Sequence, residues 1–481
     1  MLAWLEERTG AVSALTQFLT EDVPGGASYW YVFGSATMFA LILQVVTGIF
    51  LTFYYAPSAA TAWESTKFIY DKVPLGSFVI SLHYWGATAM IALVVMHLLQ
   101  VLLFGAYKKP REVQWVVGVL LFLFTLVMGL TGYLLPWDLN AFFASQVAIN
   151  IAGTVPVIGS GIQTFLQDGA TIGTLTINRF FGVHVWLMPA LLLALTGMHL
   201  AIFRHNGGAG PAVDEAELKK MKPGRFWPNQ LFMDAVVSFI VFALICALAV
   251  MSPAPLDDKA DPNQTSFQPY PAWYFLSLFG LLKYLPPNLE LLGTVVLPGG
   301  LLTVLILLPW LDRNPSRRLS RRPWLVSITA LTVAGTIALS VLAQMQIAAG
   351  RAASPTVASS VSAPTGGSGT ASTDTSGPGA KIYAANCSSC HGASGAGMPG
   401  AFPPLAGNAY VTGNPKAVEH TLLYGLNGAI KVGGATYNGV MPPWKGTLSN
   451  ADIANVVTYI RSSWGNKASA VTEAQVSSVT K

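Results

Sequence analysis

The chain has 481 residues, of which 52% are hydrophobic and only 10% are charged. Soluble domains carry about a quarter charged residues, so this composition indicates an integral membrane protein and excludes an ordinary soluble enzyme. The net charge of +5 does not indicate a nucleic-acid partner. The basic residues lie in short loops between apolar segments, where they report membrane topology.

Residues 1–25 are expected to form an amphipathic surface helix. They lack the basic start and the small-residue cleavage site of a signal peptide. Their larger apolar side chains, among them Trp4, Leu15 and Phe18, suit a helix that lies in the membrane interface.

Seven segments are apolar enough, at about 20 residues each, to cross a lipid bilayer. We place these spans near residues 30–54, 78–104, 114–135, 181–203, 231–251, 290–310 and 324–347. The first four spans form a four-helix core over 26–210, and the last three form a second half over 211–349.

The loops after the second, fourth and sixth spans are rich in lysine and arginine, which predicts that they lie on the cytoplasmic side. The basic residues in these loops are Lys108, Lys109, Arg111, Arg204, Lys219, Lys220, Lys222, Arg225, Arg313, Arg317, Arg318, Arg321 and Arg322. Seven spans then place the N-terminus inside and the chain after residue 347 outside. We expect a multi-pass protein of the bacterial inner membrane with its C-terminal domain on the periplasmic side.

Four histidines lie in two of the spans at matching intervals. His83 and His97 are fourteen residues apart, and His184 and His199 are fifteen apart. Either interval returns to about the same helix face after about 21 Å. Antiparallel helices would pair His83 with His184 near the outer side and His97 with His199 near the inner side. Two imidazoles per iron leave no open position, which predicts two electron-carrying b haems.

Glycines repeat with nearly the same interval in the first and third spans. Gly34 and Gly48 are fourteen residues apart, as are Gly118 and Gly132. Because glycine permits close approach, each of these four residues is expected to let a porphyrin edge lie against bare backbone. The alternative for the glycines is that they are ordinary glycines of membrane helices, with no role at a haem. The alternative for the histidines is that they are four unrelated buried polar residues, each bonded to its neighbours.

Residues 350–379 are almost wholly Ala, Ser, Thr, Gly and Pro, which predicts a flexible linker. A small soluble domain follows over 380–465, and residues 466–481 are expected to be a disordered tail. The fold class is therefore all-α: a seven-span helix bundle that holds two b haems, and a small all-α cytochrome c domain.

Near its start, after residues 380–386, the domain contains the motif Cys387-Ser-Ser-Cys390-His391, which is typical of covalent attachment of haem c. Helices are expected over 380–386, 417–425 and 452–464. Met441 lies in a loop before the last helix and is the predicted second iron ligand. Met398 follows His391 by only seven residues, which is too near to reach the opposite face of the haem. We do not interpret this motif as a zinc site, because the sequence contains no second cluster of metal ligands. Cys246 is a single cysteine within a span, and we expect it to be an unreactive side chain that packs among apolar neighbours.

Several longer motifs carry a family resemblance. They are KKPREVQWVVG, GLTGYLLPWD, TVPVIGS, NRFFGVHVW and WPNQLFMD, within residues 108–234. With these motifs, residues 15–345 resemble the cytochrome b subunit of quinol–cytochrome c reductases. The fifteen-residue histidine interval resembles the plastid-type and menaquinol-type members, whose two halves are often separate chains and are fused here.

The resemblance implies two quinone sites. The outer site would use residues 132–138, 154–160 and 271–275, with Pro271, Ala272, Trp273 and Tyr274 in the last of these. The inner site would use Arg204, His205 and Asp234.

This chain departs from the family pattern at three positions. Ala272 replaces the glutamate that accepts a proton from quinol, so Asp138, Tyr274 and Lys283 become candidate bases, with Asp138 preferred. The alternative for Asp138 is a helix-capping or solvated carboxylate. Tyr84 replaces an arginine that contacts haem propionates, and Val32 replaces the cysteine of an extra covalent haem, which is expected to be absent.

The resemblance implies a proton-translocating quinol–cytochrome c reductase subunit. The sequence contains no Rieske motif, so we expect a separate Rieske iron–sulfur protein, a homodimeric complex and a soluble or membrane electron acceptor. Two alternatives stay open: a non-bifurcating quinol dehydrogenase with a modified outer site, and a haem-bearing anchoring subunit without quinone turnover.

Overall fold

The computed structural model describes residues 1–167, 172–262, 264, 267, 269–286, 289–353, 377–387, 391–392, 395–397, 402–441, 443–446 and 448–480. They belong to two compact units. The first comprises Met1–Ala260 and Pro269–Pro355, and the second comprises Asp261–Gln268 and Thr356–Lys481.

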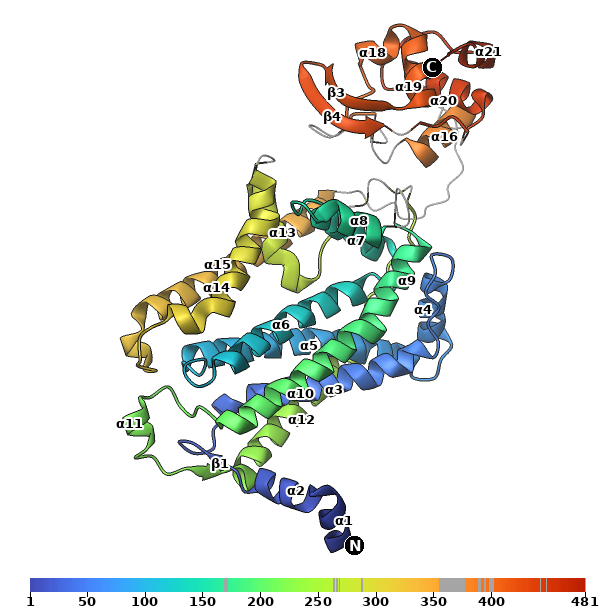
Figure 1. The fold of residues 1–481 in the computed structure, drawn as a ribbon. Helices are drawn as coiled ribbons and strands as arrows, with labels where there is room; N and C mark the ends of the chain where they lie inside the picture. Colours follow the sequence, from blue (N-terminus) through green and yellow to red (C-terminus); the bar gives the residue numbers. More distant parts are fainter. Residues whose placement is uncertain are drawn as a thin grey trace. The chain divides into compact units, whose positions relative to one another are not determined.

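The first unit is a bundle of long apolar helices (Figure 1). Within the described residues, seven helical segments are long and apolar enough to span a membrane, as the sequence predicts. These segments are Tyr29–Thr52, Gly76–Leu103, Glu112–Tyr133, Thr174–Asn206, Phe226–Met251, Leu292–Leu311 and Pro323–Ala349. The fourth is longer than expected, because α9 (Thr174–Gly182) continues through a π-helical turn at Val183–Leu187 into α10 (Met188–Asn206).

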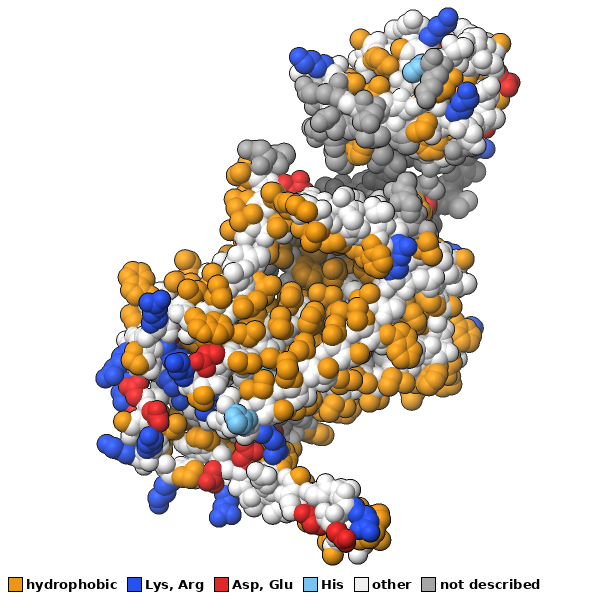
Figure 2. Space-filling model, viewed as in Figure 1, with side chains coloured by type: hydrophobic (Ala, Val, Ile, Leu, Met, Phe, Trp, Pro, Cys, Tyr) orange, Lys and Arg blue, Asp and Glu red, His pale blue; other side chains and the backbone are white. Residues whose placement is uncertain are grey.

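Five helices form the centre of the bundle. Helix α3 (Val32–Thr52) packs on α5 (Gly76–Leu103), α10 packs on α6 (Glu112–Tyr133), and α12 (Leu231–Met251) packs on both α3 and α5. Small residues such as Ala36 and Ala40 are fully buried where these helices meet. Large apolar side chains face outward and form a broad hydrophobic belt, with lysines and arginines gathered beyond one edge (Figure 2). This distribution suits a lipid environment.

The second half adds α14 (Leu297–Leu311), which packs on α6, and α15 (Pro323–Ala353), which packs on a shorter helix, α13 (Leu276–Tyr284). Loops between spans also contain helices: α4 (Ala62–Asp71), α7 (Leu139–Gly153), α8 (Gly159–Leu166) and α11 (Glu215–Leu218).

The N-terminal segment forms two short helices in place of the single one expected, α1 (Leu2–Thr9) and α2 (Ala11–Leu19). Gly10 separates them with a φ of 63°, a backbone conformation that glycine adopts without strain. Strand β1 (Asp22–Val23) then pairs with β2 (Gly224–Arg225), which ties this segment to the start of α12.

The second unit is mostly helical, and three of its helices, α16 (Pro378–Asn386), α19 (Pro415–Tyr424) and α20 (Asn450–Ser462), match those expected. Helices α18 (Ala409–Thr412) and α21 (Glu473–Ser477) were not expected. Tyr383, Leu422, Ile453 and Val457 form the buried centre of the unit.

Two features of this unit differ from the sequence prediction. An antiparallel hairpin of β3 (Leu426–Val432) and β4 (Ala435–Met441) stands where an all-α domain was expected, with a glycine pair at its turn. In place of the expected disordered tail, α21 packs against α20 and buries Val471 and Val476. A capping box between Thr472 and Gln475 stabilises the start of α21. Of the expected linker, residues 354–376 lie outside the described residues.

Candidate haem and quinone sites

The structure brings His83 and His184 together between α5 and the π-helical turn. We refer to this as the outer pair, after the orientation that the basic loops predict, and to His97 with His199 as the inner pair. The ring centroids of the outer pair lie 6.2 Å apart. An imidazole nitrogen binds a metal at about 2 Å, so this separation has room for one metal ion between two facing nitrogens.

Threonines orient both rings of the outer pair. His83 Nδ1 lies 2.9 Å from Thr47 Oγ1, and His184 Nδ1 lies 3.2 Å from Thr131 Oγ1 and 3.1 Å from the carbonyl oxygen of Met128. Because a carbonyl only accepts, His184 Nδ1 carries the proton and Nε2 keeps its lone pair for a metal. The residues therefore fit a bis-histidine haem.

Each of the four glycines faces one histidine ring. A Cβ atom at Gly48 would lie 3.3 Å from His83 Cε1, and one at Gly132 would lie 2.5 Å from His184 Cε1. The inner pair repeats this arrangement: Gly34 faces His97 at 3.3 Å, and Gly118 faces His199 at 3.4 Å. The glycines thus make room for the imidazole rings, which refines the expectation that they make room for porphyrin edges.

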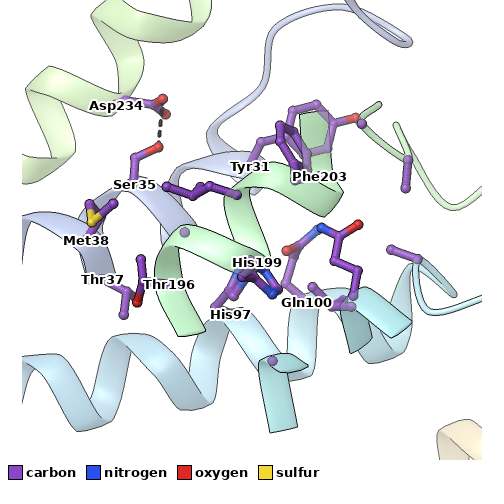
Figure 3. A pocket seen from close by; sticks show the side chains of 18 of the residues that line it. Tyr31, Ser35, Thr37, Met38, His97, Gln100, Thr196, His199, Phe203 and Asp234 are labelled. Carbon is purple, nitrogen blue, oxygen red and sulfur yellow. Dashed lines mark hydrogen bonds between the residues drawn. The ribbon is translucent and has the colours of Figure 1, made fainter. Parts of the chain in front are cut away.

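A cavity of about 700 Å³ surrounds the inner pair. His97, His199 and two of the expected quinone-site residues, Arg204 and Asp234, line it. The side chains that Figure 3 labels come from several helices and surround the two rings. His205, which the resemblance placed in the same site, is an exposed residue outside the lining set.

Asp234 is a buried carboxylate that lines this cavity, with only 5% of its surface exposed. One carboxylate oxygen accepts a hydrogen bond of 2.9 Å from Ser35 Oγ (Figure 3). The other accepts one of 2.9 Å from Gln230 Nε2. The Arg204 guanidinium lies 4.6 Å from the centre of the Phe18 ring, which ties it to the N-terminal helix α2.

The expected outer quinone site lies in the segment that leads into α13. Ala272 precedes a short 3-10 turn, Trp273–Phe275, and has no ionisable group to offer. Tyr274 reaches α6, since a Cβ at Gly129 would lie 2.7 Å from its hydroxyl oxygen. Burial raises the pKa of Tyr274, so its phenol stays protonated.

Asn140 holds this segment in place, a role that the sequence analysis missed. Its Oδ1 accepts a hydrogen bond of 3.0 Å from the backbone nitrogen of Tyr270, and its Nδ2 donates to the Tyr270 carbonyl at 3.2 Å. Nδ2 also donates to the Tyr133 hydroxyl. Pro271 directly follows this anchored residue.

Asp138 acts as the N-cap of α7 and is 8% exposed. Its Oδ1 accepts a hydrogen bond from the Ala141 backbone nitrogen at 2.8 Å, and its Oδ2 accepts one from the Asp257 nitrogen at 3.2 Å. Burial raises the pKa of this carboxyl despite both hydrogen bonds. Lys283, the third candidate base, lies over the Phe279 ring at 4.5 Å.

The second unit contains a pocket of about 140 Å³ that Cys387, His391 and Met441 line. The hairpin forms one wall of it and places Met441 at the end of β4. His391 Nδ1 lies 2.9 Å from the Pro403 carbonyl oxygen, so it donates there and leaves Nε2 for iron. This donor set fits haem c. Cys390 and Met398 lie outside the described residues.

Three family models match the chain. Residues 18–207 match cytochrome b/b6/petB, residues 259–361 match cytochrome b(C-terminal)/b6/petD, and residues 376–464 match cytochrome c.

Individual relatives support the same assignment. The menaquinol:cytochrome c reductase cytochrome b subunit of Geobacillus thermodenitrificans is 40% identical over 216 residues, which are 43% of this chain and 96% of the relative. The cytochrome bc complex cytochrome b subunit of Chlorobaculum thiosulfatiphilum is 36% identical over 319 residues, 65% of this chain and 74% of the relative. A solved hyperthermophilic respiratory Complex III chain aligns with a TM-score of 0.65 at 28% identity, covering 72% of this chain and 91% of that one.

The fold and the matches define a haem-binding, multi-pass membrane protein of a bacterial respiratory chain. The chain belongs to the cytochrome b family. It is the cytochrome b subunit of a quinol–cytochrome c reductase of the bc type, with both cytochrome b halves and a cytochrome c domain in one polypeptide.

Proposed function

We propose that the chain binds two b haems and one covalent c haem. His83 and His184 hold the outer b haem, and His97 and His199 hold the inner one. The observation that carries this assignment is that each of the four imidazole rings lies against a glycine on a neighbouring helix, with the outer rings 6.2 Å apart.

The haem c iron takes His391 and Met441 as ligands, with Cys387 and Cys390 as the points of covalent attachment. Haem with a His and Met ligand pair has a raised potential and transfers single electrons. The Pro403 carbonyl supports this role by fixing the ring orientation of His391.

Within the complex, quinol is oxidised at the site around Pro271–Tyr274, and quinone is reduced at the site around Arg204 and Asp234. Protons are released outside and taken up inside. A separate Rieske iron–sulfur protein receives one electron and passes it to the cytochrome c domain. The second electron crosses the membrane along the two histidine pairs. The complex is a homodimer that delivers electrons to an external acceptor.

The substrate that the relatives favour is menaquinol. The subunits of Geobacillus thermodenitrificans and Bacillus subtilis that carry this quinol in their names are each 40% identical to this chain over 216 residues. Residues 18–207, which match the cytochrome b/b6/petB model, contain all four histidines and most of the residues that line the inner cavity.

A non-bifurcating quinol dehydrogenase is the second candidate, and Ala272 favours it. Residue 272 has no carboxylate, and both carboxylate oxygens of Asp138 accept hydrogen bonds from backbone nitrogens. The outer site therefore has few groups that can accept a proton from quinol. Such an enzyme would oxidise quinol without splitting its two electrons between separate paths.

Optical spectroscopy of the purified complex distinguishes these functions. Menaquinol should reduce the b haems, and an oxidant pulse with the inner site inhibited should increase b-haem reduction. Reduction without that increase would indicate the non-bifurcating enzyme. Failure of quinol to reduce any haem would contradict both and leave an anchoring subunit.

A further inference from the structure

Glu419 is an acidic residue in the interior of the second unit. It lies in the middle of α19, where it is 0% exposed and stands between the buried residues Val418 and Leu422. Charged side chains are almost never fully buried unless they are paired. A glutamate at this position therefore needs either a partner or a neutral form.

Neither carboxylate oxygen of Glu419 has a partner among the described residues. Both oxygens are buried and accept no hydrogen bond there, and none of the ion pairs in the described part of the chain includes this residue. An unpaired buried ion costs far more free energy than an unpaired neutral group. The protonated form of this carboxyl is therefore the favoured one in the folded domain.

Arg461 on α20 is a buried cation whose charge acts on Glu419, but its donors are bonded elsewhere. It is only 2% exposed. Its Nη1 donates to the carbonyls of Val411 at 2.7 Å and Gly413 at 3.0 Å, and its Nε donates to that of Ser469 at 3.0 Å. The guanidinium is thus held among backbone carbonyls and does not complete an ion pair with the carboxylate.

The other ionisable groups of the surrounding helices do not pair with Glu419 either. Helix α19 packs on α18, α20 and α21 (Figure 1). Besides Arg461, these four helices carry Tyr410, Lys416, His420, Tyr424, Asp452, Tyr459 and Glu473. Tyr410, Lys416, His420 and Glu473 are exposed, and Asp452 bonds Ser449 in a capping box. Burial raises the pKa of the Glu419 carboxyl, although Arg461 and Lys416 act in the opposite direction.

Glu419 lies directly behind one wall of the haem c pocket. Val418, Thr421 and Leu422 of the same helix line this pocket, whereas Glu419 is outside the set of described residues that line it. The effective dielectric constant of a protein interior is lower than that of water, so charges interact more strongly across it. A change of charge on the iron should therefore be felt at this carboxyl.

We propose that Glu419 is a redox-linked protonation site, which takes up one proton when the haem c iron is reduced and releases it when the iron is oxidised. Ferric iron and a carboxylate thus gain one electron and one proton, and they become ferrous iron and a carboxylic acid. The electron is the one that the Rieske partner delivers, and the proton is exchanged with the solvent around the domain. The inference rests on the proposed attachment of haem c to this domain.

This coupling determines the sign of two pH dependences. Ferric iron carries one more positive charge than ferrous iron and favours the carboxylate, so the potential of haem c should fall as the pH rises. The folded domain also holds the proton of Glu419 to a higher pH than the unfolded chain does, because burial raises the pKa of this carboxyl. The domain should therefore lose stability as the pH rises from the ordinary value of a glutamate through the raised one.

The test is an optical redox titration of haem c at several pH values, in the full-length protein within its complex. Glu419→Gln keeps the size of the side chain and removes its titration. Glu473→Gln is the matched control, since it makes the same change at an exposed glutamate of the adjacent helix α21. The carboxylates of the haem titrate in all three proteins, so the difference between the parent and Glu419→Gln isolates Glu419. Thermal melting of the haem c signal at the same pH values is the second measurement.

In the parent and in Glu473→Gln, the equilibrium constant for reduction should fall by up to about tenfold per pH unit, which is about 59 mV for one electron. Glu419→Gln should lose most of this slope, and its melting temperature should depend less on pH. An equal slope in Glu419→Gln and the parent overturns the inference, as does an equal loss in Glu473→Gln.

A parent potential that is independent of pH also overturns the inference. If Glu419→Gln fails to assemble haem c, the melting of the parent decides, and a melting temperature that does not fall as the pH rises counts against a buried, protonated Glu419. A parent protein without covalent haem would instead contradict the proposed function.

Discussion

The imidazole of His184 lies in the space that a side chain at Gly132 would need. A Cβ atom at Gly132 would approach His184 Cε1 to 2.5 Å, closer than any stable contact, whereas one at Gly118 would lie 3.4 Å from His199 Cε1. Both histidine pairs have a glycine beside each ring, but the space beside the His184 ring of the outer pair is smaller than that beside the His199 ring of the inner pair.

Gly132→Ala should therefore displace His184 and reduce binding of the outer b haem, while the inner b haem and haem c remain. Gly118→Ala should have a small effect, because its contact is of ordinary length. Gly197→Ala is the control: this glycine lies on the same helix as His199 and has no atom within 4 Å of a built Cβ. Haem content and the split of the b-haem absorption band measure the outcome. Equal haem loss in the Gly197 and Gly132 variants would count against steric fit as the cause.

The methionine at the end of the hairpin should control the haem c potential. Met441→Ala should lower that potential and weaken the red absorption band that arises from iron–sulfur bonding, because thioether ligation raises the potential. A redox titration of haem c and its visible spectrum provide the measurement. An unchanged spectrum and potential would transfer the ligand role to Met398.

The C-terminal helix α21 should stabilise the cytochrome c domain. Removal of residues 471–480 exposes the surface that Val471 and Val476 cover, with 6% and 1% of these side chains exposed. Each buried valine contributes about 1.5–3 kcal/mol, so the loss should be several times the thermal energy. Thermal melting of the haem c signal in the full chain should occur at a lower temperature. An unchanged melting temperature would mean that α21 packs without contributing to stability.

The orientation can be tested with a protease. An odd number of spans and basic loops on one side predict that the cytochrome c domain is outside. Protease added to intact spheroplasts should cut within residues 350–379 and release a soluble fragment that contains covalent haem. Release from inverted vesicles alone would reverse the assignment of both quinone sites.

Local sequence patterns were sufficient for much of this structure. Span lengths, the fourteen- and fifteen-residue histidine intervals and the capping signal at Ser449 depend on nearby residues, and the helices at those positions match the prediction. The hairpin and α21 also have local signals, a Gly433-Gly434 turn and a capping box at Thr472, which the sequence analysis passed over. The threonines that orient the outer pair directly precede Gly48 and Gly132, and this shared Thr-Gly pattern was another available signal.

Contacts between residues that are far apart in the chain could not be predicted from local sequence patterns. Asn140 anchors Tyr270, Ser35 bonds Asp234, Gln230 bonds the Ser28 backbone, and Arg317 bonds the carbonyls of Ala209 and Gly210. Each of these contacts joins residues that are far apart in the chain. No local periodicity connects these residues, because the pairing depends on how the spans assemble. For Asp138, the sequence allowed a capping carboxylate or a proton acceptor, and the structure assigns it a cap without excluding the second role.

The role of Asp138 gives a prediction about pH. Burial raises the pKa of this carboxyl above that of a free aspartate, so the folded protein holds its proton to a higher pH than the unfolded chain does. Its contribution to stability therefore falls as pH rises from the ordinary value through the raised one. If the carboxylate accepts the proton of quinol, activity should rise over that same interval, because only the ionised form is a base.

Asp138→Asn should remove that rising limb and slow the quinol-driven reduction of haem c and the outer b haem, with haem potentials unchanged. Asparagine still offers an oxygen to the Ala141 nitrogen, so α7 keeps its cap. Ala272→Glu in this background should restore part of the rate by returning a carboxylate to the segment before Trp273. A pH profile of pre-steady-state haem reduction in the parent and both variants decides the matter. Normal rates with an unchanged profile in Asp138→Asn would eliminate Asp138 as the base and leave Tyr274, bound water or a partner residue.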